Sequence, residues 1–174
     1  MPPSPAGFSR RIAAFGLDYL LMLAYMALLL TIRLIIIGWS PKGAPLSPER
    51  YDLGAFLTLV LPVILYFALM EASAWQATWG KRRMGLKVVS TDGVRLNLGR
   101  SLVRSAAKFG PWQIAHTCMF QLMGVTYGFG TNLFVARAGL FVSVALATAY
   151  LVTLFMSPHR TPYDRLAGSL VTRA

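Results

Sequence analysis

The chain has 174 residues, of which 56% are hydrophobic and 13% are charged, against about a quarter charged in soluble domains. The apolar residues stand in long blocks that the core of so small a soluble protein could not bury, so the composition excludes a soluble globular domain. The formal net charge of +11 is concentrated beside these blocks, which favours a lipid bilayer with anionic headgroups as the partner and argues against nucleic acid.

The first apolar segment covers residues 12–37 and the second covers residues 53–74. Each is long enough to cross a bilayer as a helix, which takes about 20 residues. Residues 38–52 between them hold several prolines and balanced charges, which predicts a loop. Two arginines precede the first segment, but the apolar run is too long for a signal peptide, so we expect a retained helix.

Residues 75–109 are strongly basic and contain Asp92 as their one acid. An Asp-Gly pair at 92–93, within loosely alternating residues 86–96, predicts a β-hairpin. Asn97 is a good cap for a following helix, in which three basic residues recur every four positions and form one polar stripe. These are Arg100, Arg104 and Lys108. We expect this amphipathic helix to lie on the membrane with its basic stripe toward lipid headgroups.

Two further apolar segments follow, a weaker one at residues 111–130 and a clear one at residues 138–156. By the positive-inside rule the N-terminus and residues 75–109 face the cytoplasm. The basic tail reaches the same side only if residues 111–130 also cross; a re-entrant segment is the alternative. The sequence therefore predicts one all-α domain in the cell (plasma or inner) membrane, a bundle of about four transmembrane segments with both termini cytoplasmic.

Three stretches of the chain stand out: Arg10-Arg11-Ile-Ala-Ala-Phe-Gly-Leu-Asp18, the run from Ala77-Thr-Trp-Gly80-Lys81 to Arg104, and His159-Arg160-Thr-Pro-Tyr-Asp164. Together they resemble the RDD family of bacterial membrane proteins. The resemblance implies that Arg11, Asp18 and Asp164 are the signature residues. It also implies a multi-pass membrane fold and the transport of an ion or a small ligand.

Arg11 and Asp18 are seven residues apart and share one face of the first helix. Asp18 lies inside the apolar segment, where an ionisable group costs ~2.5–3.5 kcal/mol, so it is either a functional group or a buried acid held by a neighbouring helix. We expect Arg11 to pair with Asp164 at the inner membrane surface and leave Asp18 free.

Glu71 stands near the inner end of the second segment, in the same leaflet as Asp18. Two carboxylates facing each other there could hold a cation or share a proton. The alternative is an interfacial ion pair of Glu71 with Lys81 or Arg82.

The sequence contains no nucleophile–base or metal-ligand spacing, which predicts no enzyme, no cofactor and no metal. Cys118 is the lone cysteine, expected to be a small apolar filler within a helix. Two functions remain. One is a transporter that uses Asp18 and Glu71 and is completed by a homo-oligomer or a membrane partner protein. The other is a non-transporting scaffold or accessory protein that recruits a partner through its basic cytoplasmic face.

Overall fold

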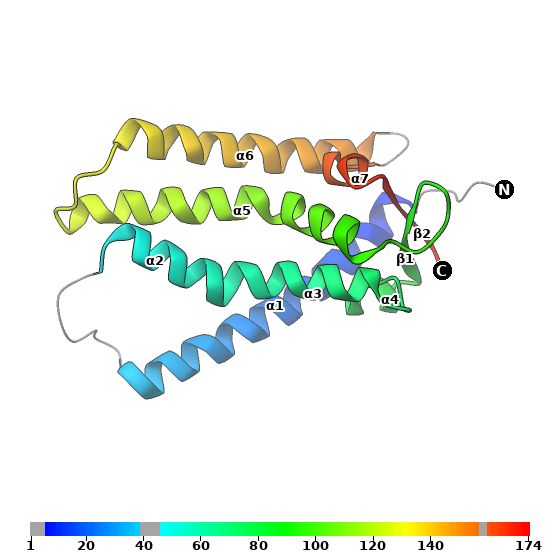
Figure 1. Cartoon of the computed structure of the whole chain (residues 1–174), viewed down its shortest axis with the longest axis horizontal. Helices are drawn as coiled ribbons and strands as arrows, with labels where there is room; N and C mark the ends of the chain where they lie inside the picture. Colours follow the sequence, from blue (N-terminus) through cyan, green and yellow to red (C-terminus); the bar gives the residue numbers. More distant parts are fainter. Residues whose placement is uncertain (1–5, 39–45, 157–159) are drawn as a thin grey trace.

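The computed structural model describes residues 6–38, 46–156 and 160–174, and in this part of the chain four long helical stretches run alternately between two ends of the molecule (Figure 1). They are α1 (Phe8–Ile37), the stretch formed by α2 (Pro48–Ala55), a π-helical turn η1 (Phe56–Val60) and α3 (Leu61–Ala72), then α5 (Leu98–Thr126) and α6 (Leu133–Phe155). The start of α1 and the end of β2 lie at one end, here called the sheet end because it carries the two strands.

The sheet end is built from four short elements: α4 (Trp79–Arg83), β1 (Leu86–Ser90), α7 (Pro162–Leu166) and β2 (Ser169–Arg173). The two strands pair antiparallel, with Leu86 opposite Arg173 and Ser90 opposite Ser169. The predicted hairpin within residues 86–96 is therefore wrong as a strand pair. What remains of it is a tight turn at Gly93 (φ 81°) and one bridge between Val89 and Arg95. The reason is that β1 forms its strand pair with the C-terminal strand β2.

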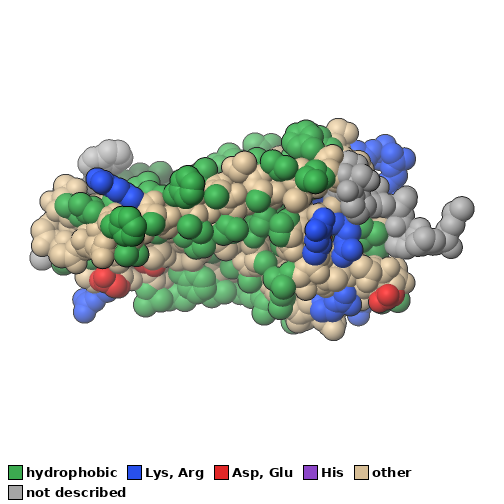
Figure 2. All heavy atoms as spheres, turned by 90° about the horizontal axis from the view of Figure 1, so that it is seen from above, with side chains coloured by type: hydrophobic (Ala, Val, Ile, Leu, Met, Phe, Trp, Pro, Cys, Tyr) green, Lys and Arg blue, Asp and Glu red, His purple; other side chains and the backbone are tan. Residues whose placement is uncertain are grey.

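Three of the long helical stretches are long and apolar enough to cross a membrane: Phe8–Ile36, Pro48–Ala72 and Leu133–Phe155. Figure 2 shows hydrophobic side chains along the middle of the face it presents and charged ones toward its two ends. The three correspond to the predicted segments 12–37, 53–74 and 138–156. The second begins at Pro48, so the last part of the predicted loop 38–52 is helical; residues 39–45 of that loop lie outside the described residues.

The predicted surface helix and most of the weaker segment 111–130 form one continuous helix, α5, which contains Pro111 and ends at Thr126. Proline has no N–H for the carbonyl four residues earlier, which is that of Ala107. Tyr150 of α6 donates its hydroxyl to this carbonyl at 3.0 Å. The Ala107 carbonyl therefore keeps a hydrogen-bond partner, and the helix continues through the proline.

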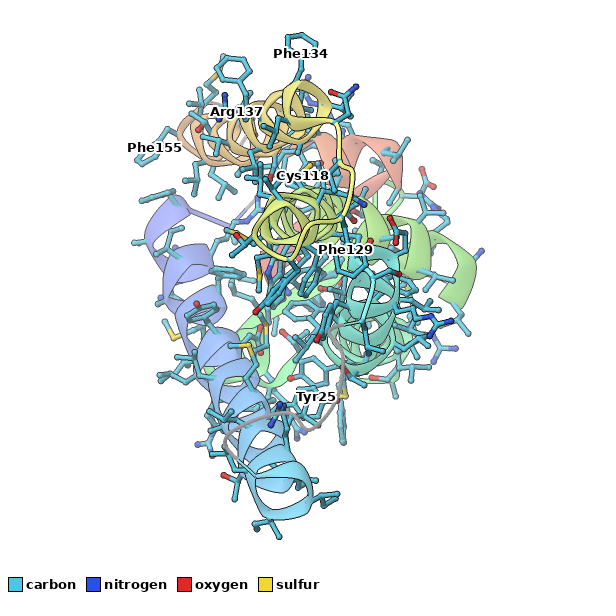
Figure 3. All side chains as sticks on the ribbon, turned by 90° about the vertical axis from the view of Figure 1, so that its left-hand side faces the viewer. Tyr25, Cys118, Phe129, Phe134, Arg137 and Phe155 are labelled. Atoms are coloured by element: carbon cyan, nitrogen blue, oxygen red, sulfur yellow. The ribbon has the colours of Figure 1, made fainter. Side chains whose placement is uncertain are left out.

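Pro62 is accommodated in the same way at the junction of η1 and α3. The carbonyl four residues before it belongs to Thr58, and Tyr25 of α1 donates its hydroxyl to that oxygen at 2.7 Å. Tyr25 lies between α1 and the α2–α3 stretch (Figure 3). The bond joins α1 to its neighbour in a region where α1 otherwise leans away from the bundle.

Helix α5 lies between α6 and the α2–α3 stretch (Figure 1). Its contact with α6 is close, since a Cβ atom added at Gly139 would lie 2.3 Å from the sulfur of Cys118. Cys118 is buried at this contact, which agrees with its interpretation as a small filler. Toward α2, Gln113 and Thr117 donate to the carboxylate of Asp52 at 2.9 and 2.7 Å. One side of α5 is thus polar and faces inward, which lowers its hydropathy below that of the other long helices.

Candidate functional site

The basic stripe of α5 points into the protein. Arg104 is 1% exposed, and Arg100 donates to the carbonyl oxygens of Ala167 and Gly168 at 2.9 and 2.5 Å. Lys108 is half-buried, with its ammonium 3.8 Å from the ring centre of Phe67. The prediction that this stripe faces lipid headgroups is wrong. Buried carboxylates on α3 and α7 attract the stripe inward, and a helical periodicity cannot distinguish them from an anionic surface.

Arg104 joins three elements of the sheet end. Its Nη1 atom is 2.5 Å from Glu71 Oε2 on α3, and its Nη2 atom is 2.7 Å from Asp164 Oδ1 on α7. Its Nε atom donates to the same Asp164 oxygen at 3.0 Å and to Ser169 Oγ at 3.1 Å. The planar guanidinium suits such multiple contacts because its donors are fixed in a fork.

Asp164 also forms the ion pair predicted with Arg11, whose Nη2 atom lies 2.7 Å from Asp164 Oδ2, so that prediction is confirmed. Its carboxylate caps α7 as well, in a capping box with Thr161. Burial disfavours the charged carboxyl, but the charges of Arg104 and Arg11 outweigh this effect and hold the pKa of Asp164 well below its usual range. The acid is therefore ionised and held from two sides.

Asp18 is fully buried and binds the start of α4. It accepts hydrogen bonds from the Gly80 N–H at 2.8 Å and from Thr78 Oγ1 at 2.5 Å, with the Tyr66 hydroxyl at 3.4 Å. These donors satisfy the carboxylate and fix α4 against α1. Of the two interpretations of Asp18, this geometry supports a buried acid held by its neighbours.

Gly80 is the point of closest approach between α4 and α1. A Cβ atom at this position would lie 2.2 Å from the Ala14 carbonyl oxygen and 2.9 Å from Asp18 Cγ. We expect Gly80→Ala to lower the free energy of unfolding by about 1–3 kcal/mol, because backbone must move to relieve the overlap. Gly110→Ala is the control, since nothing lies within 4 Å of a Cβ there and alanine favours a helix. Unfolding in mixed micelles measures both, and equal stability of the two variants would contradict the close contact.

Glu71 is held by two cations, Lys81 at 2.8 Å and Arg104 at 2.5 Å. The alternative of an ion pair with Lys81 is thus the one observed, while Arg82 stacks on Trp75. Lys81 Nζ also lies 3.4 Å from Thr78 Oγ1, which links Glu71 to the Asp18 cluster without a direct contact between the acids. Among the described residues no group of three or more His, Cys, Asp and Glu side chains is placed to hold a metal ion.

A cavity of about 520 Å³ lies between α1, α5 and α6 at the sheet end. Four cations line it: Arg11, Lys81, Arg104 and Lys108. No carboxylate is among its lining residues; the rest are mainly apolar and aromatic. No local sequence pattern indicates this site, because its cations come from three separate parts of the chain.

Lys108 differs from the other three cations of the cavity. In the described part of the chain, no carboxylate lies within ion-pairing distance of its ammonium. Its neighbours are the rings of Phe67, Phe15 and Phe109, at 3.8, 5.0 and 5.1 Å. Cation–π contacts stabilise an ammonium group in part, but they supply no negative charge to pair with it.

Comparison with known proteins agrees with the three stretches noted in the sequence. The sequence profile described as the RDD family matches residues 5–168. Uncharacterized protein YxaI of Bacillus subtilis (strain 168) is 29% identical over 110 residues, which cover 58% of this chain and 73% of that protein. No solved structure matches. Of the signature residues, Arg11 and Asp164 meet at the sheet end, whereas Asp18 binds the start of α4. His159 lies outside the described residues. Because the profile covers nearly the whole chain, this protein belongs to the RDD family of membrane proteins.

Proposed function

We propose that this protein is a multi-pass protein of the cell membrane that binds a small anionic ligand in the cavity at its sheet end, as the binding step of transport. The sheet end faces the cytoplasm in this proposal, because it carries the basic residues of α4, α5 and the tail. All four long helical stretches then cross, and both termini are cytoplasmic. A second copy or a membrane partner protein completes the path across the bilayer.

The observation that carries the proposal is the charge of the cavity lining. Three of the four cations already form ion pairs with carboxylates that do not line the cavity: Arg11, Lys81 and Arg104. These pairs stabilise the buried charges, while the cations themselves still line the cavity. Lys108 adds an amino group that has no carboxylate partner among the described residues. An anion entering the cavity would gain this ammonium as a partner in surroundings that contain little water, where an unpaired charge is costly.

Transport of a cation by Asp18 and Glu71 has less support, because both acids are fully buried and their oxygens are held by the donors described above. The alternative is a scaffold that recruits a partner through its basic cytoplasmic face. It loses the α5 stripe as part of that face, since Arg104 is internal. The surface that suits anionic headgroups is formed by α4 and the residues just before it, from Trp75 to Arg83. There Trp75 and Trp79 are exposed and Arg82 and Arg83 lie over their rings.

An anion-binding test uses the full chain in nanodiscs of phosphatidylcholine, with thermal unfolding as the readout. We expect inorganic phosphate to raise Tm saturably, and magnesium chloride at equal ionic strength to leave it unchanged, because a ligand stabilises the state that binds it. Lys108→Met should lose the response to phosphate. It should also raise Tm without phosphate, since the substitution replaces a buried amino group that has no carboxylate partner among the described residues with an apolar side chain.

The matched control is Lys87→Met, which removes a lysine of β1 that does not line the cavity. This variant should keep the phosphate response. Equal stabilisation of wild type and Lys108→Met by phosphate would contradict the proposed site, and so would stabilisation of wild type by magnesium alone.

A further inference from the structure

The mouth of the cavity opens sideways between α1 and α6. Five residues both line the cavity and are exposed: Ile12, Phe15 and Tyr19 of α1, and Ala147 and Leu151 of α6. At the sheet end the same two helices are joined by the rings of Phe8 and Phe155, whose centres are 4.0 Å apart. Figure 3 shows Phe155 directed toward the start of α1. Both helices are membrane-spanning candidates, so a mouth between them opens to the bilayer.

The cavity is polar at one end and apolar along the rest of its length. On α1 its lining extends from Arg11 to Met22, which is ~16 Å of helix at 1.5 Å per residue. The four cations lie toward the sheet end. Away from that end the lining is Met22, Trp112, Ala115, Ser143 and Ala147. A water-soluble anion would use the charged end alone and would leave this long apolar wall uncovered.

We infer that the ligand is an anionic lipid of the leaflet at the sheet end, which enters between α1 and α6, places its phosphate beside Lys108 and lays an acyl chain along the apolar wall. The inference rests on the proposed anion site and names its ligand class. The mouth is lined by apolar and aromatic side chains, as entry from hydrocarbon requires, and a volume of about 520 Å³ is within the ~300–1,000 Å³ of small-molecule sites. A lipid phosphate would supply a negative partner for the Lys108 ammonium. The acyl chain of the lipid would cover the apolar wall, which inorganic phosphate alone would leave uncovered.

The test uses Trp112, which lines the cavity, as the reporter. In the full chain with Trp39, Trp75 and Trp79 changed to phenylalanine, Trp112 is the only tryptophan. This protein is placed in nanodiscs of phosphatidylcholine that contain a small fraction of lipid with brominated chains, which quench tryptophan fluorescence. The brominated lipid is either phosphatidylglycerol or phosphatidylcholine, at equal bromine content, so contact with bulk lipid is the same in both arms.

We expect phosphatidylglycerol to quench Trp112 several-fold more strongly than phosphatidylcholine. Lys108→Gln should remove the difference, and Lys87→Gln should keep it. Equal quenching by the two lipids, together with stabilisation by inorganic phosphate, would overturn the lipid inference and leave the anion site standing. Equal quenching without a phosphate response would overturn both. A difference that persists in Lys108→Gln would also contradict the inference, since it would reflect only the general positive charge of the sheet end.

Discussion

Replacing Arg104 with methionine is expected to lower the free energy of unfolding by about 3–5 kcal/mol, the range found when one partner of a buried ion pair is removed. Glu71 and Asp164 would each lose a contact to Arg104, of 2.5 and 2.7 Å respectively, and both carboxylates are fully buried. Glu71 would keep Lys81 and Asp164 would keep Arg11, but these two ion pairs would no longer be joined through Arg104. Equilibrium unfolding in mixed micelles measures the loss.

Arg165→Met is the matched control for this experiment. Arg165 follows Asp164 directly in α7, and its side chain is exposed. Its loss should change the free energy of unfolding by no more than about 0.5 kcal/mol, as for most surface positions. Arg104→Lys should fall between the two, since lysine keeps the charge but lacks the fork that reaches both acids. An Arg104→Met protein as stable as wild type would mean that the α5 stripe does not point inward.

The second large effect is expected from Arg11 and Asp164. Asp164→Asn should destabilise more than Arg11→Gln, because Asp164 binds two arginines and caps α7, whereas the substitution at Arg11 leaves Asp164 paired with Arg104. The double variant should lose less than the sum of the single losses, by an interaction energy of about 0.5–3 kcal/mol. Strictly additive losses would show that the two residues do not form an ion pair.

The pH dependence of this pair follows from the lowered pKa of Asp164. A carboxyl whose pKa is lower in the folded state stabilises the fold above its unfolded pKa, which is about 3.9, and loses that contribution as pH falls through the folded pKa. The interaction energy of Arg11 and Asp164 should therefore stay constant between about pH 8 and about pH 5. Its disappearance within that range would show that the acid is not held by the two arginines.

The membrane helices could be predicted from the sequence because their signal is local. A long apolar run needs no partner to be recognised, and α1 and α6 begin and end within a few residues of the predicted segments. The ion pair of Arg11 and Asp164 could be predicted as well. That prediction used two premises. The family resemblance named the two residues, and an even number of predicted membrane crossings placed the tail on the side where α1 begins.

The orientation of the α5 stripe could not be predicted, because its cause is remote in sequence. Arg100, Arg104 and Lys108 repeat every four residues whether they face lipid headgroups or buried carboxylates. The deciding groups, Glu71 and Asp164, lie 33 and 60 residues from Arg104. Glu71 carried a partial signal, since a lone acid at the end of an apolar helix needs a cation and more than one was within reach.

The strand pairing and the continuity of α5 have the same explanation. The Asp-Gly turn is a local signal and is present, but the partner of β1 is the end of the chain, which no local pattern identifies. Pro111 is a local signal for a helix end, and it is overridden by one hydroxyl on another helix, that of Tyr150. In each case a contact formed only in the folded bundle outweighs the preference of a short segment.

The measurement that tests the central claim most directly is lysine footprinting of the unmodified protein in its membrane with a water-soluble amine reagent. Lys87 lies on β1 at the sheet end, whereas Lys81 is paired with Glu71 and Lys108 lies in the cavity beneath Phe15 and Phe67. Lys87 and Lys108 are both half-buried, but the ammonium of Lys108 lies against three aromatic rings. We therefore expect Lys87 to react faster than Lys81 and Lys108, and the difference to disappear when the protein is unfolded in detergent. Reaction of Lys108 at the rate of Lys87 in the folded protein would contradict an inward-facing basic stripe and the anion site built on it.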